Sequence, residues 1–197
     1  MLNDMIGLAR LSLTAPRDGA RAVLSIDLPR QALWMIGALA VVLSVIISQL
    51  STLLYPSTAM GPMAEMLSNP ALVLGAHGTI FVVTVLATYQ IGRAFGGRGS
   101  FDASLKIVAW MQVVMLLVQA AQFVALILFA PLAAMIGLVS IVLFFWIFTL
   151  FVTELHGFSS AGAVFAGIVA SMIGIIFALS ILLGLFSSFI PGVPQSV

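Results

Sequence analysis

The sequence has no cysteine, which excludes disulfide bonds, thiolate metal ligands and a cysteine nucleophile. Charge is also scarce, because only 7% of the 197 residues are charged, whereas a soluble domain carries about 25%. So few charges could not cover the surface of a water-soluble fold, and 62% of the residues are apolar. The chain is therefore predicted to be an integral membrane protein.

The small number of histidines and the low net charge exclude further classes of function. The two histidines, His77 and His156, lie far apart and lack the spacing of metal ligands. The net charge of +1 gives no reason to expect nucleic acid as a partner. No nucleophile, metal set or acid–base pair is recognisable. We therefore expect no metal, no cofactor and no enzymatic activity.

Residues 1–28 are predicted to form a cytosolic or interfacial segment ahead of the membrane domain. Within residues 1–14 the apolar side chains gather near one helical face, as in a helix that lies at the membrane surface. Pro16 can open a second short helix that runs through Leu24.

Five apolar segments follow, each long enough at 1.5 Å per residue to cross a hydrocarbon core of about 30 Å. The predicted spans are residues 33–54, 71–92, 105–128, 133–153 and 162–189. The third and fourth come from one uncharged run, Ile107 to Thr153, which as a single helix would be about 70 Å long. Pro131 therefore marks a turn within residues 129–133.

The predicted fold class is all-α, an integral membrane bundle of five transmembrane helices over residues 29–190, preceded by short N-terminal helices. Residues 56–70, which contain three prolines, are expected to form an irregular loop, and residues 191–197 a short outer tail. With five spans, every basic residue falls on one side of the membrane: Arg10, Arg17, Arg21, Arg30, Arg93, Arg98 and Lys106. The positive-inside rule places that side, and the N-terminus, in the cytosol and the C-terminus outside.

The turn between the second and third spans carries a family resemblance. Its sequence is Arg93-Ala94-Phe95-Gly96-Gly97-Arg98-Gly99-Ser100-Phe101, followed by Leu105 and Ala109-Trp110. This stretch resembles the "GGxGSF" signature of the Ypt-interacting protein (Yip) domain family. Residues 156–166 resemble the polar segment before that family's last span. The resemblance covers about residues 29–190 and implies the same five-span plan.

The resemblance implies a role in membrane organisation. Eukaryotic members bind small GTPases and shape or sort membranes, whereas bacterial members have no settled role. The cysteine-free chain, with arginine at six of its seven basic positions, suits a bacterial-type member in the cytoplasmic (inner) membrane. The GTPase partnership does not transfer to a bacterium, which lacks that partner system.

The glycine-rich turn is also the first candidate site. A phosphate loop needs a preceding strand and a Gly-Lys-Ser/Thr end, and neither is present here. A tight helix–helix turn is the favoured interpretation, with Ser100 or Asp102 as the cap of the third span. A partner or a lipid headgroup could still use the flanking arginines. The candidate partner-contact turn is Arg93, Gly96, Gly97, Arg98 and Gly99.

The fifth span has a row of small residues at every fourth position, namely Gly162, Ala166, Ala170 and Gly174. Small residues at this spacing let helix backbones approach closely in lipid. Packing inside one bundle is the favoured interpretation, and self-association through this helix is the alternative.

Four polar residues inside the spans form a candidate interior polar cluster: Gln49, His77, Gln119 and Gln122. Counted along the helices, three of them fall at similar depths, about 21 to 24 Å from the cytosolic edge. The favoured interpretation is that these residues hold the helices together by hydrogen bonds, each worth about 0.6 kcal/mol. A substrate or proton path is the alternative. Glu154 and His156, in contrast, are interpreted as parts of a solvated loop.

The favoured function is a non-enzymatic, Yip-like accessory or scaffold subunit that acts through helix packing and its cytosolic face. Its expected partners are membrane lipid and other membrane proteins, or further copies of itself. The alternative is a small transporter or permeation subunit that uses the interior polar cluster.

Overall fold

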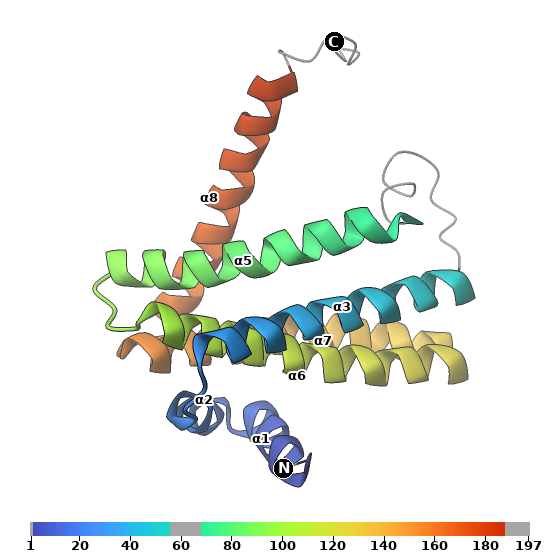
Figure 1. The fold of residues 1–197 in the computed structure, drawn as a ribbon, viewed down its shortest axis with the longest axis horizontal. Coiled ribbons are helices and arrows are strands. Elements are labelled where there is room, and N and C mark those ends of the chain that lie inside the picture. Colours follow the sequence, from blue (N-terminus) through green and yellow to red (C-terminus); the bar gives the residue numbers. More distant parts are fainter. Residues whose placement is uncertain (1, 56–67, 188–197) are drawn as a thin grey trace.

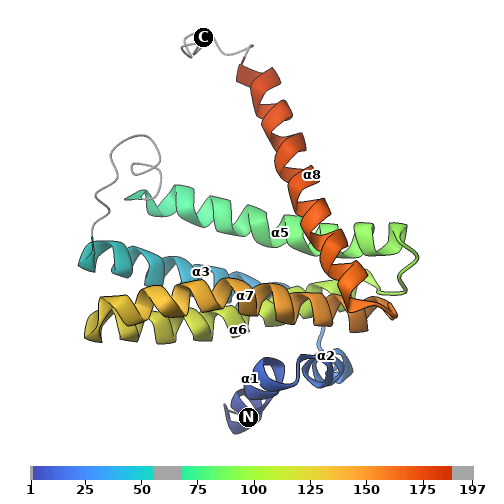
Figure 2. The same cartoon turned by 180° about the vertical axis from the view of Figure 1, so that it is seen from behind.

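The computed structural model describes residues 2–55 and 68–187, which are almost entirely helical. Four long helices lie side by side, two short N-terminal helices sit on one flank, and the last helix leaves the bundle at a steep angle (Figures 1 and 2). The helices of the described residues are α1 (Leu2–Thr14), α2 (Pro16–Ser25), α3 (Arg30–Leu54), α5 (Pro70–Ala94), α6 (Phe101–Leu128), α7 (Ala130–His156) and α8 (Ala161–Ser187). The predicted all-α class is confirmed.

Five of these helices, α3 and α5 to α8, are long and apolar enough to cross a membrane. The predicted fold class, an integral membrane bundle with five spans after short N-terminal helices, is therefore also confirmed. The fourth span shows how far the bounds differ, because it is predicted at residues 133–153 and observed at Ala130–His156. Most of the predicted loop at 56–70, the end of the fifth span and the whole tail at 191–197 lie outside the described residues.

Short polar and proline signals set the helix ends. Asn69 caps α5, where its side-chain oxygen accepts hydrogen bonds from the backbone N–H groups of Ala71 and Leu72 at 3.0 and 3.3 Å. Ser100 caps α6 by accepting one from the Ala103 N–H at 3.1 Å. A single residue, Phe129, separates α6 from α7, so the turn predicted at Pro131 is very tight.

The core lies toward one end of the bundle, where α3 and α6 begin and α5 and α7 end (Figure 1). Arg30 of α3, Arg93 of α5, Lys106 of α6 and Arg98 of the α5–α6 turn lie at this end, which is called the basic end below. Phe151 and Ile147 of α7 and Leu105 and Ile107 of α6 are almost completely buried in it. Toward the other end α7 turns large apolar side chains such as Leu138 outward, as expected of a lipid-facing surface.

The N-terminal helices dock against the basic end through polar contacts. The buried Trp110 indole N–H of α6 donates to the Ser12 hydroxyl of α1 at 2.9 Å. Arg21 of α2 donates twice to the Glu154 carboxylate of α7, at 3.0 and 3.3 Å. Both helices are thereby fixed to the membrane domain at defined points.

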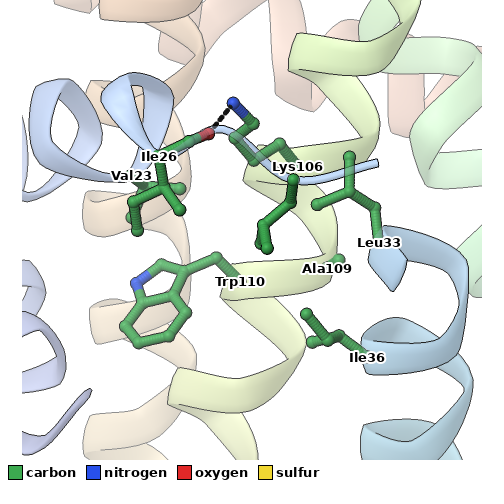
Figure 3. Close-up of a pocket in the computed structure, with 8 residues that line it drawn as sticks. Val23, Ile26, Leu33, Ile36, Lys106, Ala109 and Trp110 are labelled. Carbon is green, nitrogen blue, oxygen red and sulfur yellow. Dashed lines mark hydrogen bonds between the residues drawn. The ribbon is translucent and has the colours of Figure 1, made fainter. Parts of the chain in front are cut away.

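Lys106 closes the seam between α2 and the bundle. Its ammonium donates to the backbone carbonyls of Leu24 and Ile26, at the end of α2, where a helix leaves carbonyls unpaired. Figure 3 shows the ammonium at the edge of a small apolar hollow between α2, α3 and α6, with the Trp110 ring opposite. This half-buried cation is stabilised because the two carbonyl oxygens accept hydrogen bonds from its ammonium.

The last helix, α8, is unlike the other four. None of its most apolar 18-residue window is buried, whereas 17 to 33% is buried in the other spans. Its contact with the bundle is near its start, where Phe165 meets Phe145 of α7 with ring centroids 6.1 Å apart. Beyond that point α8 extends away from the four long helices (Figure 2).

Candidate functional site

The glycine-rich turn joins α5 to α6 through a compact set of backbone hydrogen bonds. The Gly97 N–H donates to the Gly92 carbonyl at 2.8 Å, and the Gly96 N–H donates to the Arg93 carbonyl at 3.0 Å. Gly96 has a φ of +84°, a left-handed conformation that side chains other than glycine seldom adopt. The turn therefore ends α5 abruptly and fixes the direction in which α6 begins.

His156, the last residue of α7, lies beneath this turn and is 1% exposed. Its Nδ1 accepts a hydrogen bond from the Gly99 N–H at 3.2 Å, and its Nε2 lies 3.0 Å from the Thr88 carbonyl of α5. Because Nδ1 is an acceptor, the proton belongs on Nε2, where it is donated to Thr88. A neutral imidazole thus satisfies both nitrogens and links three segments.

Three glycines make room for the imidazole, and we call them the glycine socket: Gly92, Gly97 and Gly99. A Cβ atom at Gly92 would lie 2.1 Å from the His156 Nε2, and one at Gly97 would lie 2.3 Å from Nδ1. At Gly99 it would lie 2.8 Å from the ring Cε1. No side chain fits at these positions unless the ring moves. The glycines are thus required by close approach to the ring.

We call the His156 imidazole in the glycine socket, with its hydrogen bonds to Thr88 and Gly99, the lock. A backbone hydrogen bond and a neighbouring aromatic ring complete it. The Arg98 N–H donates to the His156 carbonyl at 3.1 Å, so the turn is bonded to the end of α7 as well as to the ring. Phe158 stacks on the imidazole with centroids 5.4 Å apart. Gly157, with a φ of +70°, ends α7 in a left-handed cap.

The interpretation of His156 as part of a solvated loop is wrong. The missed signal was Gly157, a helix-ending glycine that makes His156 the last residue of α7. Glu154 is also less solvated than expected, because Arg21 covers it from α2 and only 17% of its side chain is exposed.

The backbone N–H groups of the turn have internal acceptors. Those of Gly96, Gly97, Arg98 and Gly99 bond to protein carbonyls or to the His156 ring. They are therefore not aimed at an anion as the N–H groups of a phosphate loop are. What the turn offers outward is side chains, because Arg93 and Arg98 are exposed and Phe95 is 74% exposed.

The residues predicted as an interior polar cluster have different surroundings. Gln119 of α6 donates to the Ser44 carbonyl of α3 at 3.0 Å, whereas the Gln122 amide lies against Gly137 of α7. His77 is exposed on α5, and its Nδ1 lies 3.0 Å from the Val73 carbonyl of the same helix. Gln49 is half-buried on α3. The structure thus directs Gln119 and Gln122 to different helices and leaves His77 on the outer surface.

The row of small residues on α8 is also outside the bundle. Gly162, Ala166, Ala170 and Gly174 are all exposed. A Cβ atom added at Gly174 would meet no other atom within 4 Å. Packing of this row inside the bundle, the favoured interpretation from the sequence, is not the arrangement seen.

Comparison with known protein families gives one clear finding. The family model of the Yip1 domain matches residues 10–182, which is most of the chain and includes the turn, the glycine socket and His156. Comparisons with curated proteins and with solved structures give no match. The resemblance inferred from the glycine-rich turn is therefore confirmed at the level of the family.

Placing one methyl group inside the glycine socket tests the packing of His156 against it. We expect Gly92→Ala to lower the stability of the detergent-solubilised protein by about 1 to 3 kcal/mol, because the methyl group overlaps the imidazole. The matched control is Gly78→Ala on the same helix, where a Cβ atom meets nothing within 4 Å and alanine favours the helix. Thermal unfolding of both variants is the measurement, and equal stability of the two would contradict the lock.

Proposed function

The chain belongs to the Yip1 domain family, and from that premise we propose that it is a non-enzymatic accessory or scaffold protein of the membrane. Its work is to hold another membrane protein, or a second copy of itself, through α8. The partner-facing surface is the row of small residues on that helix. The four-helix bundle serves as the rigid base from which α8 extends.

One observation carries this proposal: α8 makes little contact with its own bundle. In lipid, helices gain no hydrophobic energy from meeting each other, so association depends on close packing and on hydrogen bonds. The exposed glycines and alanines of α8 provide a surface on which a second helix can pack closely. If the row were buried inside the bundle, it could pack only against helices of the same chain.

The proposed location is a bacterial cytoplasmic membrane, with the basic end in the cytosol. The positive-inside rule supports this orientation, because the described basic residues belong to the basic end and to the helices docked there. The N-terminal helices then lie on the cytosolic side, and α8 begins there and leads the chain outward.

The transporter alternative receives no support from the contacts of the polar residues. Gln119 and Gln122 lie against α3 and α7, an arrangement suited to helix packing. His77 faces outward from α5. Two hollows in the described part of the chain are lined mainly by apolar side chains, and none of the four polar residues lines either.

A photocrosslink from α8 tests the accessory role, and because the chain has no cysteine of its own, each variant carries the label at one position of the chain. Ala170→Cys lies on the small-residue row, whereas the control Met172→Cys lies about 160° around the same exposed helix. Each variant is labelled in native membranes with a photoreactive maleimide. We expect at least about tenfold more of one defined adduct from position 170, because close packing requires the row.

The adduct should disappear when Gly174→Ile is added to the Ala170→Cys variant, because the larger side chain blocks close approach. Its mass distinguishes a second copy from another protein. Equal labelling from positions 170 and 172, or no adduct from either, would contradict the proposal.

Accessibility of single cysteines tests the orientation. Ser159→Cys is exposed at the basic end, and Phe129→Cys is exposed at the opposite end of the bundle. With a membrane-impermeant maleimide on intact cells, we expect position 129 to be labelled at once and position 159 only after the membrane is opened. The reverse pattern would place the basic end outside.

A further inference from the structure

We propose that Arg93, Phe95 and Arg98 form a headgroup site for an anionic phospholipid of the leaflet at the basic end. These three residues, called the headgroup site below, project from the glycine-rich turn. The proposal does not depend on α8 or on a protein partner. It rests on the distribution of ion pairs, the rigidity of the turn and its depth in the membrane.

Ion pairs leave this turn with unbalanced positive charge. Arg17 and Arg21 are paired with Glu154, and Arg30 donates twice to the Asp102 carboxylate. Lys106 is held by two backbone carbonyls. Among the described residues, no ion pair includes Arg93 or Arg98, and both side chains are exposed. The two guanidinium groups at the ends of the turn thus have no acidic partner in the described part of the fold.

The turn holds these groups on a fixed backbone. Gly97 is bonded to Gly92, and Arg98 and Gly99 are bonded to His156. A ligand therefore has only the arginine side chains to order, which lowers the entropic cost of binding. Since the N–H groups of the turn are already bonded internally, the guanidinium groups provide the recognition. Guanidinium binds phosphate through paired, charge-assisted hydrogen bonds.

The depth of the turn favours lipid over an acidic protein segment. The uncharged stretch of α5 from Ala71 to Gly92 is about 33 Å long, close to the thickness of a hydrocarbon core. Arg93 is then the first residue at the level of the headgroups. Phe95, 74% exposed, follows directly, and aromatic side chains are stabilised at this boundary. A bilayer supplies apolar surface for Phe95 and phosphate for the arginines at the same depth.

The charge of the site selects the kind of lipid. A zwitterionic headgroup also carries an ammonium, whose positive charge is repelled by two unpaired guanidinium groups. A headgroup with net negative charge, such as phosphatidylglycerol, is attracted to the same groups without that repulsion. The site should therefore prefer phosphatidylglycerol to phosphatidylcholine.

Lipid retention by the purified protein tests the site. Native mass spectrometry counts phosphatidylglycerol retained from mixed micelles with phosphatidylcholine, and thermal unfolding reports stabilisation by each lipid. Wild type should retain phosphatidylglycerol preferentially, and Arg93→Gln/Arg98→Gln should lower its affinity by about fivefold per arginine. Phe95→Ala should weaken retention with both arginines in place. Inorganic phosphate alone should give no comparable stabilisation.

The control is Arg10→Gln/Arg17→Gln, which removes the same charge from the N-terminal helices and should keep the preference. Equal losses in the two double variants would mean general charge attraction and would overturn the site. The absence of a preference for phosphatidylglycerol in wild type would also overturn the site. So would the finding that the arginine substitutions release a bound protein and leave lipid retention unchanged. If the glutamine variant does not fold, Arg93→Lys/Arg98→Lys replaces it. Because lysine lacks the planar fork, this variant should bind more weakly than wild type, and unchanged binding would contradict the proposal.

Discussion

The arrangement of the basic end depends on the fit of one imidazole into three glycines. His156 joins the end of α7 to α5 through Thr88 and to the α5–α6 turn through Gly99. The Arg98 N–H adds a backbone bond to the His156 carbonyl. In lipid, where apolar surface gives helices no preference for one another, such polar and close-packed contacts determine which helices meet and in what register.

The other contacts at the basic end build outward from this lock. It orients the last turn of α7, which carries Glu154, and Glu154 receives Arg21 and so holds α2. It also fixes the start of α6, whose Lys106 and Trp110 hold the end of α2 and the side of α1. The exposed arginines and Phe95 of the turn are positioned by the same backbone. α8 begins at Ala161, a short step after Gly157, and lies outside this network along most of its length.

The sequence predicts well where each helix begins and ends. It predicts poorly which face of a helix turns toward its neighbours. The lengths of uncharged runs locate the spans, and Ser100 and Pro131 locate helix starts because their effects are local. Lipid and protein core are both apolar, so periodicity does not show which face of α8 turns inward. For the same reason, the similar predicted depths of His77 and Gln122 do not show whether the two side chains face each other. His156 and Gly99 are in contact although they are 57 positions apart in the sequence. The only indication of such a contact in the local sequence is the glycines that close approach requires.

The most direct test of this account is the protonation state of the His156 ring in the folded protein. The chain has two histidines, so ¹⁵N spectra of histidine-labelled protein in lipid can be assigned with a His77→Gln variant. We predict a single neutral tautomer for His156, with the proton on Nε2 and a scalar coupling from Nδ1 to the Gly99 amide. A protonated ring, a proton on Nδ1 or a ring that averages between tautomers would contradict the lock on which the basic end is built.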